Sequence, residues 1–550
     1  MSPRNAFLTL VTVIVSALTL LFHGTALAGP GVDKQRELFS QVYADAERGT
    51  WASVDALSAG DRALLQEYVL WPDLRAAWYR ATMRTTDRDS LEAFLERHGT
   101  LKPARELRYS YALHLAASGQ LDRFLRIYRA YYQGLGVARL DCTALHAEIE
   151  AGSGDRIVNR GRNLWLTGRS QAKECDPVFA YMREQNQLTE DDYRARFALA
   201  VEAREFRRAR WLARSLDDVL LEQANDWLRA QSRPQQFVDT HGQRPDTALS
   251  REQLAYAIER ITYRDPQTAL ELWNSLEDAY AFPAQLRQAT RRHIALWTAR
   301  DNLPGAYDLL TSLPLEAQDE EVMRWRARVS LRAEQWADLL NDIAMMTADE
   351  RDSEQWRYWR GIALARSGRN VAARAALEPL AAERSYYGFL AADELGITYA
   401  FAHDTLQPEE DIIEALSRRP ELVRARELFL VGLDGRGRSE WDAVVADLPA
   451  AEKMQAAVLA HRWGWHSRAI ATAANVGHYD DLALRYPLPF RQTFEQHATS
   501  ASIPTTWALG IARSESLFMR DVRSRAGAIG LMQLMPATGR QVAQQIKLAY

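Results

Sequence analysis

The clearest candidate for chemistry in this chain is Glu515, which lies near the end of a predicted helix. The segment from Pro504 to Phe518 is predicted to be helical, and proline suits its first turn. At about 100° per residue, Glu515 falls within one apolar face of this helix. The other residues of that face are Trp507, Ala508, Ile511, Ala512 and Phe518. Because burial and the negative end of the helix dipole both disfavour a charged carboxylate, we expect a carboxylic acid able to donate a proton at neutral pH.

A buried ion pair is the alternative interpretation of Glu515. Candidate partners for it are Arg513, Arg523 and Arg525. The following segment, residues 524–539, favours the catalytic interpretation because its small residues and glycines let backbone approach a ligand closely. In the same segment Ser524 and Gln533 offer hydrogen bonds to such a ligand.

This part of the chain resembles the soluble lytic murein transglycosylases, whose catalytic domain is similar to goose-type lysozyme. The resemblance is carried by Glu-Ser at 515, by Ser524 nine positions later, and by Gly-Ala-x-Gly-Leu-Met-Gln-x-Met-Pro at 527–536. It extends backward to 387–392, 486–488 and Cys175-Asp176-Pro177. The resemblance implies that Glu515 is the catalytic acid/base. It also implies that Ser524, Gln533 and Met535 line the saccharide groove.

Two departures from the family pattern stand out. Met519-Arg520 replaces the Asn-Pro or similar pair that family members usually carry after Glu-Ser-x-aromatic. The sequence also stops at Tyr550, within a predicted helix that has no stop signal. We therefore expect the catalytic domain to be incomplete, and the chain as given to cleave little or no peptidoglycan.

The family resemblance implies a reaction with one acid. Glycosidases usually use two carboxylates, but beyond Ala501 the only other acid is Asp521, in a predicted loop. Glu515 would protonate the oxygen between N-acetylmuramic acid and N-acetylglucosamine and then deprotonate the muramic C6 hydroxyl. The product would be a 1,6-anhydromuramyl end, with no metal or organic cofactor. A true hydrolase and a non-catalytic periplasmic helical scaffold remain alternatives.

The rest of the chain is predicted to be all-α, and few β-branched runs interrupt it between Val32 and Asn475. Arginines at four helix–turn–helix junctions recur at intervals of 36, 32 and 34 residues, which suits stacked helical hairpins. These arginines are Arg264, Arg300, Arg332 and Arg366. Six tryptophans lie among the hairpins, and helical spacing favours the core over a sugar-binding surface for most of them. They are Trp273, Trp297, Trp325, Trp336, Trp356 and Trp359.

Together with the resemblance, these patterns predict four segments. Residues 1–28 are a signal peptide and residues 29–398 form a superhelical ring or solenoid of α-hairpins. A helical linker domain covers 399–485, and the lysozyme-like domain begins near two helix-breaking prolines, at 486, and runs to 550.

The N-terminus predicts export. Arg4 precedes an apolar run from Ala6 to Phe22, and small residues end at Ala28, which is typical of a cleavable signal peptide. The run is shorter than the roughly 20 residues of a spanning helix, so a permanent membrane anchor is the weaker alternative. We expect a soluble periplasmic protein without stable membrane insertion after cleavage.

The only two cysteines, Cys142 and Cys175, lie in the exported part, where an even pair favours one disulfide over two buried thiols. No Cys-x-x-Cys or His-Glu-x-x-His motif indicates a metal site. The formal net charge of −4 argues against nucleic acid, whose binding needs a basic stripe. The expected partners are peptidoglycan glycan strands, with other cell-wall enzymes as candidates.

Overall fold

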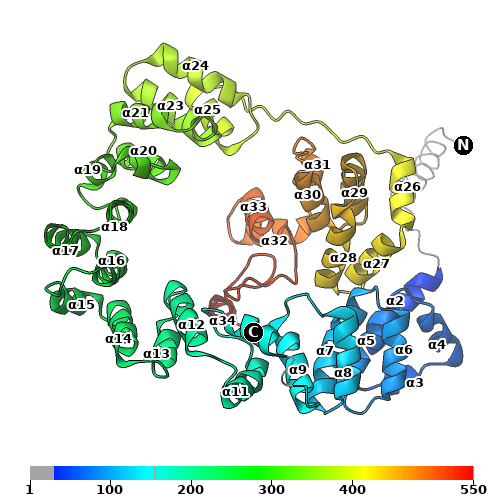
Figure 1. The fold of residues 1–550 in the computed structure, drawn as a ribbon. Coiled ribbons are helices and arrows are strands. Elements are labelled where there is room, and N and C mark those ends of the chain that lie inside the picture. Colours follow the sequence, from blue (N-terminus) through cyan, green and yellow to red (C-terminus); the bar gives the residue numbers. More distant parts are fainter. Residues whose placement is uncertain (1–29, 154–156, 549–550) are drawn as a thin grey trace, which may run out of the picture. The chain divides into compact units, whose positions relative to one another are not determined.

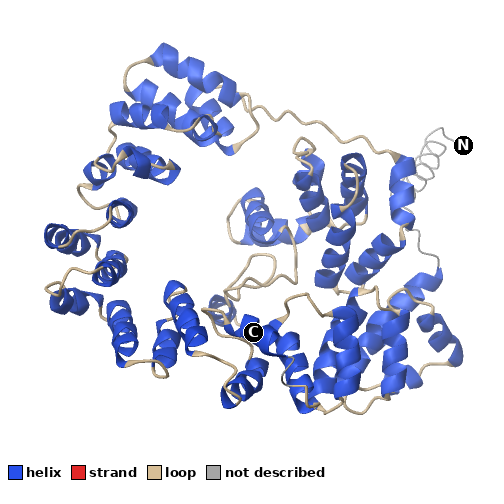
Figure 2. Cartoon of the chain, in the orientation of Figure 1, coloured by secondary structure: helices blue, strands red, loops and turns tan. Residues whose placement is uncertain are grey.

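The computed structural model describes residues 30–153 and 157–548, and throughout these ranges the regular structure is helical (Figures 1 and 2). Only two isolated β-bridges, both near the end of the chain, occur in the described part. The prediction of an all-α fold is confirmed. The predicted signal peptide lies outside the described residues. Among the described helices, none combines the length and apolar character that crossing a membrane would need.

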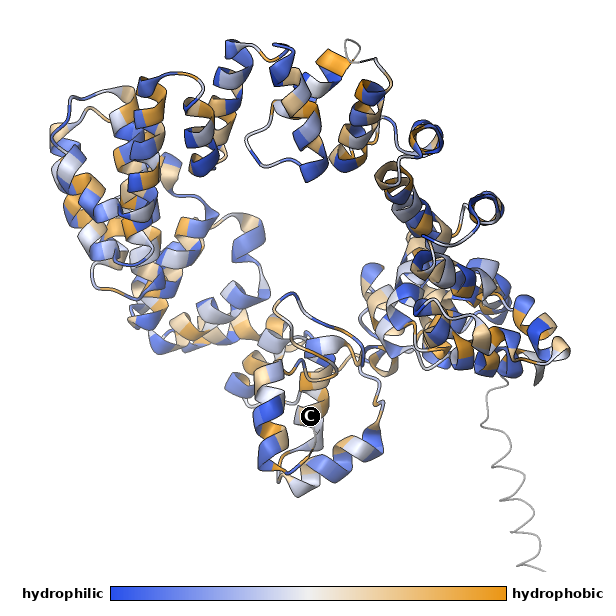
Figure 3. Cartoon of the chain, turned by 90° about the horizontal axis from the view of Figure 1, so that it is seen from below, coloured by the Kyte–Doolittle hydropathy of each residue, from blue (hydrophilic) through white to orange (hydrophobic). Residues whose placement is uncertain are grey.

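The chain forms two compact units, residues 1–114 with 403–550, and residues 115–402. In both, helices carry hydrophobic and hydrophilic residues side by side, as expected when one face is buried (Figure 3).

Residues 115–402 contain the predicted helical hairpins. Its helices are α8 (Leu121–Tyr131), α9 (Ala138–Glu150), α10 (Val158–Trp165), η2 (Lys173–Cys175), α11 (Asp176–Glu184), α12 (Glu190–Glu202), α13 (Phe206–Ala213), α14 (Asp218–Ser232), α15 (Pro234–His241), α16 (Ala248–Thr262), α17 (Pro266–Ala279), α18 (Ala284–Arg300), α19 (Ala306–Thr311), η3 (Leu315–Ala317), α20 (Glu320–Arg332), α21 (Trp336–Met345), α22 (Ala348–Arg351), α23 (Glu354–Arg366), α24 (Asn370–Ala381) and α25 (Tyr386–Leu395).

The four predicted junctions are confirmed, because each arginine lies at or just beyond the end of one helix and a second helix follows within a few residues. At the junction that contains Arg264, a side-chain cap and a proline explain where the second helix begins. The Asp265 carboxylate accepts a hydrogen bond from the backbone N–H of Thr268 at 3.0 Å, and Pro266 occupies the first turn of α17. Of the tryptophans, Trp273 and Trp356 are fully buried and the other four are half-buried, which supports the core interpretation.

Cys142 on α9 and Cys175 at the end of η2 are joined by a disulfide, with Cα atoms 4.8 Å apart. Both side chains are buried in a core that also holds Trp165 and Phe179. The bond therefore joins two residues that are 33 positions apart in the sequence and lie in the same buried core.

The other unit combines the two ends of the chain. Its N-terminal helices are α2 (Pro30–Glu47), α3 (Ala52–Asp55), α4 (Ala59–Gln66), α5 (Trp71–Ala81), α6 (Arg88–Arg97) and most of α7 (Lys102–Ala117). Its C-terminal helices are α26 (Glu410–Arg418), α27 (Pro420–Leu430), α28 (Asp434–Ala446), α29 (Ala450–Arg462), α30 (His466–Asn475), α31 (Leu482–Arg485), α32 (Arg491–Ser500), α33 (Thr505–Ser516) and α34 (Pro536–Gln545).

Buried charges hold these two ends together. Arg424 of α27 pairs with Asp73 of α5 and, at 2.9 Å, with Glu440 of α28. The Tyr68 hydroxyl donates to Glu427 of α27 at 2.8 Å. Because these groups are largely withdrawn from water, losing one partner would leave an uncompensated buried charge. The network fixes α27 and α28, from which one wall of the cavity described below is built.

The expectation that the sequence stops within a helix is wrong. Helix α34 ends at Gln545, and Lys547 adopts a left-handed backbone with φ of 56°. The backbone N–H of Leu548 then donates to the carbonyl of Ala543 at 2.9 Å, the bond of a Schellman cap. A non-glycine residue, Lys547, supplies the left-handed position, so no glycine marks the end of this helix in the sequence.

Candidate active site

Glu515 lies in the last turn of α33 and its side chain is exposed, so the expectation of a buried carboxyl group is wrong. The face of α33 that is buried consists of Ala508, Leu509, Ala512 and Ser516. Trp507 and Ile511 had centred the predicted face on Glu515, but Trp507 is exposed and Ile511 is only half-buried. The helix ends before Phe518, because Leu517 and Phe518 both have positive φ, so Phe518 does not belong to the helical pattern. Glu515 therefore lies at the border of the buried face.

The ion-pair interpretation of Glu515 finds no support in the structure. Among the described residues, the Glu515 carboxylate has no hydrogen-bond or salt-bridge partner. The nearest candidate in sequence, Arg513, donates from Nε to the carbonyl of Arg485 at 2.7 Å. Its guanidinium lies 4.5 Å from the ring centre of Tyr486, and burial lowers its pKa. The Glu515 carboxylate is thus available to bind a ligand.

An apolar row leads along α33 to this carboxylate. Trp507, Ile511 and Glu515 follow one another at intervals of four, which places them along one side of the helix. The Trp507 side chain is 58% exposed, which is unusual for the largest apolar residue. An exposed indole in line with a free carboxylate is suited to stacking against a sugar ring near a proton donor.

The segment after α33 is fastened to it by Ser516. The buried Ser516 hydroxyl lies 2.8 Å from the carbonyl oxygen of Leu531 and 2.9 Å from that of Ala512. Around Leu531 the chain forms two narrow β-bridges, Arg523 with Ile529 and Ile529 with Leu534. The end of the helix and the glycine-containing segment are therefore one connected piece.

Two glycines make that segment possible. Gly527 and Gly530 have φ of 94° and 74°, a region that side chains disfavour. Gly530 also donates from its N–H to the carbonyl of Val522 at 3.0 Å. A substitution at either glycine would strain the turn on which the segment depends.

The structure shows what the other predicted site residues contact. The Ser524 hydroxyl accepts from the N–H of Ala528 at 3.0 Å, and the Gln533 amide donates to the carbonyl of Gly530 at 2.9 Å. Both side chains therefore support the segment itself. Met535 precedes α34 with 43% of its surface exposed.

Asp521 is committed to an ion pair that the sequence did not reveal. Both of its carboxylate oxygens accept from Arg438 of α28, at 2.9 and 3.2 Å, and Arg438 also binds Asp434. Partial burial favours neutral Asp521, but the hydrogen bond and charge of Arg438 outweigh this and lower the pKa of Asp521. Since 83 residues separate the pair, no local spacing could have indicated it.

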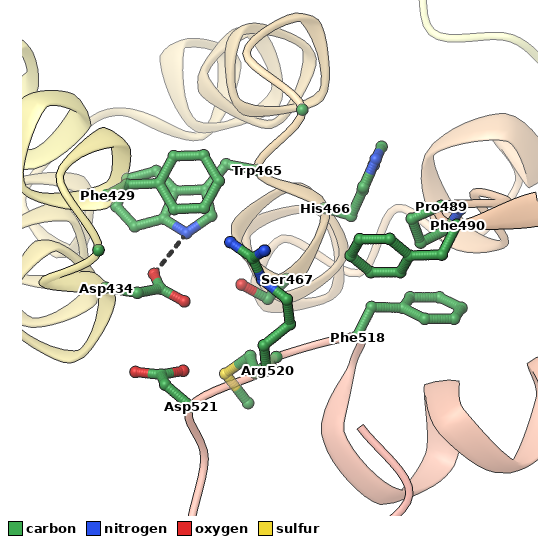
Figure 4. Close-up of a pocket in the computed structure, with 13 residues that line it drawn as sticks. Phe429, Asp434, Trp465, His466, Ser467, Pro489, Phe490, Phe518, Arg520 and Asp521 are labelled. Carbon is green, nitrogen blue, oxygen red and sulfur yellow. Dashed lines mark hydrogen bonds between the residues drawn. The ribbon is translucent and has the colours of Figure 1, made fainter. Parts of the chain in front are cut away.

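A cavity of about 570 Å³ lies beside this ion pair (Figure 4). One wall comes from α27, α28 and α30, and the other from residues 489–490 and 518–521. Neither Glu515 nor the predicted groove residues line it. Within the described residues, no cluster of histidine, cysteine and carboxylate side chains could hold a metal ion.

Two family models match the part of the chain that carries the site. The soluble lytic murein transglycosylase L domain matches residues 415–482, and the transglycosylase SLT domain matches residues 492–550. The soluble lytic murein transglycosylase of Escherichia coli K12 is 24% identical over 552 residues, which cover 98% of this chain and 82% of that protein.

In these two domains and over most of its length, the chain is similar to the soluble lytic murein transglycosylases. Solved structures of the family have the same fold. An inactive mutant of the lytic transglycosylase Slt from Pseudomonas aeruginosa superposes with a TM-score of 0.70 at 28% identity, over 93% of this chain and 83% of that one. The 70-kDa soluble lytic transglycosylase of Escherichia coli gives a TM-score of 0.79 at 24% identity, over 94% and 83%. The predicted family resemblance is confirmed.

Proposed function

We propose that this protein is a lytic transglycosylase that cleaves the β-1,4 bond between N-acetylmuramic acid and N-acetylglucosamine in peptidoglycan, leaving 1,6-anhydromuramyl ends. One observation carries the proposal. Glu515, in the segment matched by the transglycosylase SLT domain, is an exposed carboxylate without a partner among the described residues. It stands in line with an exposed tryptophan, as a site for a sugar chain requires.

The ion pair of Asp521 supports a reaction with a single acid. Beyond Ala501 the chain has only two acidic residues, Glu515 and Asp521. Asp521 is held by Arg438 through both oxygens, which makes it a poor base or nucleophile. A hydrolase of the usual kind would need a second free carboxylate nearby. In the proposed reaction Glu515 serves first as acid and then as base.

The reaction follows from these roles. Glu515 donates a proton to the glycosidic oxygen, and the bond from that oxygen to C1 of the muramic acid breaks. The acetamido group of the substrate stabilises the positive charge that develops at C1. Glu515 then removes the proton of the C6 hydroxyl, whose oxygen bonds to C1, and the carboxyl group is restored.

We also propose how the remaining predicted residues serve this reaction. Ser524, Gln533 and Met535 line the saccharide groove. The two side-chain hydrogen bonds of Ser524 and Gln533 support this proposal indirectly, because they give the segment a fixed shape.

For the whole chain we propose periplasmic action in cell-wall turnover after removal of residues 1–28. Residues 29–398 would form the superhelical domain, 399–485 the linker domain and 486–550 the beginning of the catalytic domain. The matches to the L domain and the SLT domain support the last two divisions.

The test is product analysis. Purified protein with a complete catalytic domain is incubated with intact sacculi, and the released fragments are identified by mass spectrometry. We expect anhydromuramyl ends, which are one water lighter than the ends a hydrolase releases. Reducing muramic acid ends would show a hydrolase instead, and binding to sacculi without any release would favour the scaffold alternative.

A further inference from the structure

The cavity beside the Arg438 ion pair is built as a ligand site with aromatic walls. Phe429 and Trp465 stack with ring centres 4.8 Å apart on one side. Phe490 and Phe518 contribute rings from the other side, as Figure 4 shows. All of these residues belong to the same compact unit. Its volume of about 570 Å³ is in the range of pockets that hold small ligands.

Arg520 brings an uncommitted positive charge into this cavity. Its side chain is exposed, and among the described residues it has neither a hydrogen-bond acceptor nor an ion-pair partner. In Figure 4 it extends between the two walls toward Ser467. A free guanidinium among aromatic rings recognises a carboxylate, to which it can donate two parallel hydrogen bonds.

The same cavity also carries negative charge. Asp434 and Asp521 both line it and share Arg438. Asp434 also accepts from the Trp465 indole at 2.8 Å, but the Asp521 side chain keeps 39% of its surface exposed. One shared guanidinium cannot use all acceptor positions of two carboxylates, so Asp521 retains capacity for a cationic donor. The lining thus offers one site for a carboxylate and one for an ammonium group.

The proposed reaction leaves Arg520 without a role, and the cavity does not include Glu515.

We propose that this cavity binds a short peptide end that carries both a free ammonium group and a carboxylate, with Arg520 holding the carboxylate and Asp521 the ammonium group. The diamino acid of an uncrosslinked peptidoglycan stem carries both of these groups. Identifying the ligand as such a stem rests on the proposed function. The site would hold a stem at a distance from the bond being cleaved, since the cavity does not include Glu515.

The experiment measures binding without turnover. The probe is the stem tripeptide N-acetyl-L-alanyl-γ-D-glutamyl-meso-diaminopimelate, titrated into the whole protein by calorimetry. Arg520→Gln is compared with Arg523→Gln, a nearby exposed arginine that does not line the cavity. Glu515→Gln tests whether the peptide occupies the catalytic groove instead. A second probe has the free amino group of its diamino acid acetylated.

We expect Arg520→Gln and the acetylated probe each to weaken binding by roughly tenfold or more, since each removes a hydrogen bond to a charged group. Arg523→Gln and Glu515→Gln should bind as the wild type does. If free diaminopimelate bound as tightly as the tripeptide, the cavity would be a site for a free amino acid. That result would overturn the proposal that its ligand is a peptidoglycan stem. No tripeptide binding, an unchanged Kd in Arg520→Gln, or equal losses in both arginine variants would overturn the site itself. Because no step requires cleavage, these results are independent of the sacculus assay.

Discussion

The hydroxyl of Ser516 lies 2.8 Å from the carbonyl oxygen of Leu531, which ties the end of α33 to the glycine-containing segment. Ser516 directly follows Glu515, and its side chain is buried while that of Glu515 is exposed. The neighbour of the proposed acid thus fixes the direction in which the acid projects. Leu531 belongs to the matched Gly-Leu-Met-Gln sequence, so this contact joins the two halves of the family motif.

Replacing Ser516 with alanine should therefore harm both the fold and the reaction. The lost contact should lower the local unfolding free energy by about 1 kcal/mol. Cleavage should fall by about tenfold or more, because a carboxyl group displaced by a fraction of an ångström is poorly placed. Thermal unfolding and release of fragments from sacculi measure the two effects. Ser514→Ala, which alters an exposed serine on the same helix, should change neither, and an equal loss in both variants would contradict the explanation.

Glu515→Gln, in a chain with a complete C-terminal domain, should abolish cleavage while the fold is kept. The amide has nearly the same shape as the acid but no proton of suitable acidity, so we expect a loss of at least about 100-fold. Because Glu515 has no structural partner, the unfolding temperature should not change. The matched control is Glu495→Gln on α32, which alters a surface carboxylate bound to Arg491 at 2.6 Å. Substantial turnover by Glu515→Gln would assign the acid to another residue.

The fold could be predicted further than the site because its signals are local. The helical pattern and each junction are readable over a few residues, and the structure contains the four predicted junctions at Arg264, Arg300, Arg332 and Arg366. The family motif was readable for the same reason, since it occupies one uninterrupted stretch.

What the sequence could not show depends on backbone conformation and on distant contacts. The burial of Glu515 was predicted wrongly because Trp507 and Ile511, which lie in line with it, do not face the core. The end of α33 was not predicted either, because Leu517 takes a positive φ although it is not glycine. The pair of Arg438 with Asp521 joins helices far apart in the chain, so the cavity beside it was also unpredictable.

The disulfide between Cys142 and Cys175 should contribute strongly to the stability of its unit. Closing the loop between them is worth roughly 3 to 4 kcal/mol in the chain-entropy model. We expect no free thiol in denatured, unreduced protein, and a lower unfolding temperature in the double variant Cys142→Ala/Cys175→Ala. A thiol assay and thermal unfolding with and without reductant provide the measurements. Two thiols per unreduced chain would rule the bond out.

The last prediction concerns Asp226, a buried carboxylate in residues 115–402 that has three cationic or polar partners. It binds Arg229 at 2.7 Å, Arg244 at 2.8 Å and the Nε2 of His241 at 2.9 Å. Burial favours the neutral acid, but these partners outweigh it and lower the pKa of Asp226 below its ordinary value of 3.8.

A group whose pKa is lower in the folded state stabilises the fold above its unfolded pKa, and this contribution is lost as the pH falls through the folded value. Asp226→Asn should therefore destabilise the protein at about pH 7 by about 2 kcal/mol, less than for a fully buried pair because both arginine side chains are nearly half exposed. The difference from wild type should shrink at about pH 3, where the unfolded carboxyl group is protonated. Urea unfolding at the two pH values measures it, with exposed Asp239→Asn on α15 as the control. A difference that stays constant between the two values would mean that Asp226 stabilises the fold by packing and not by its charge.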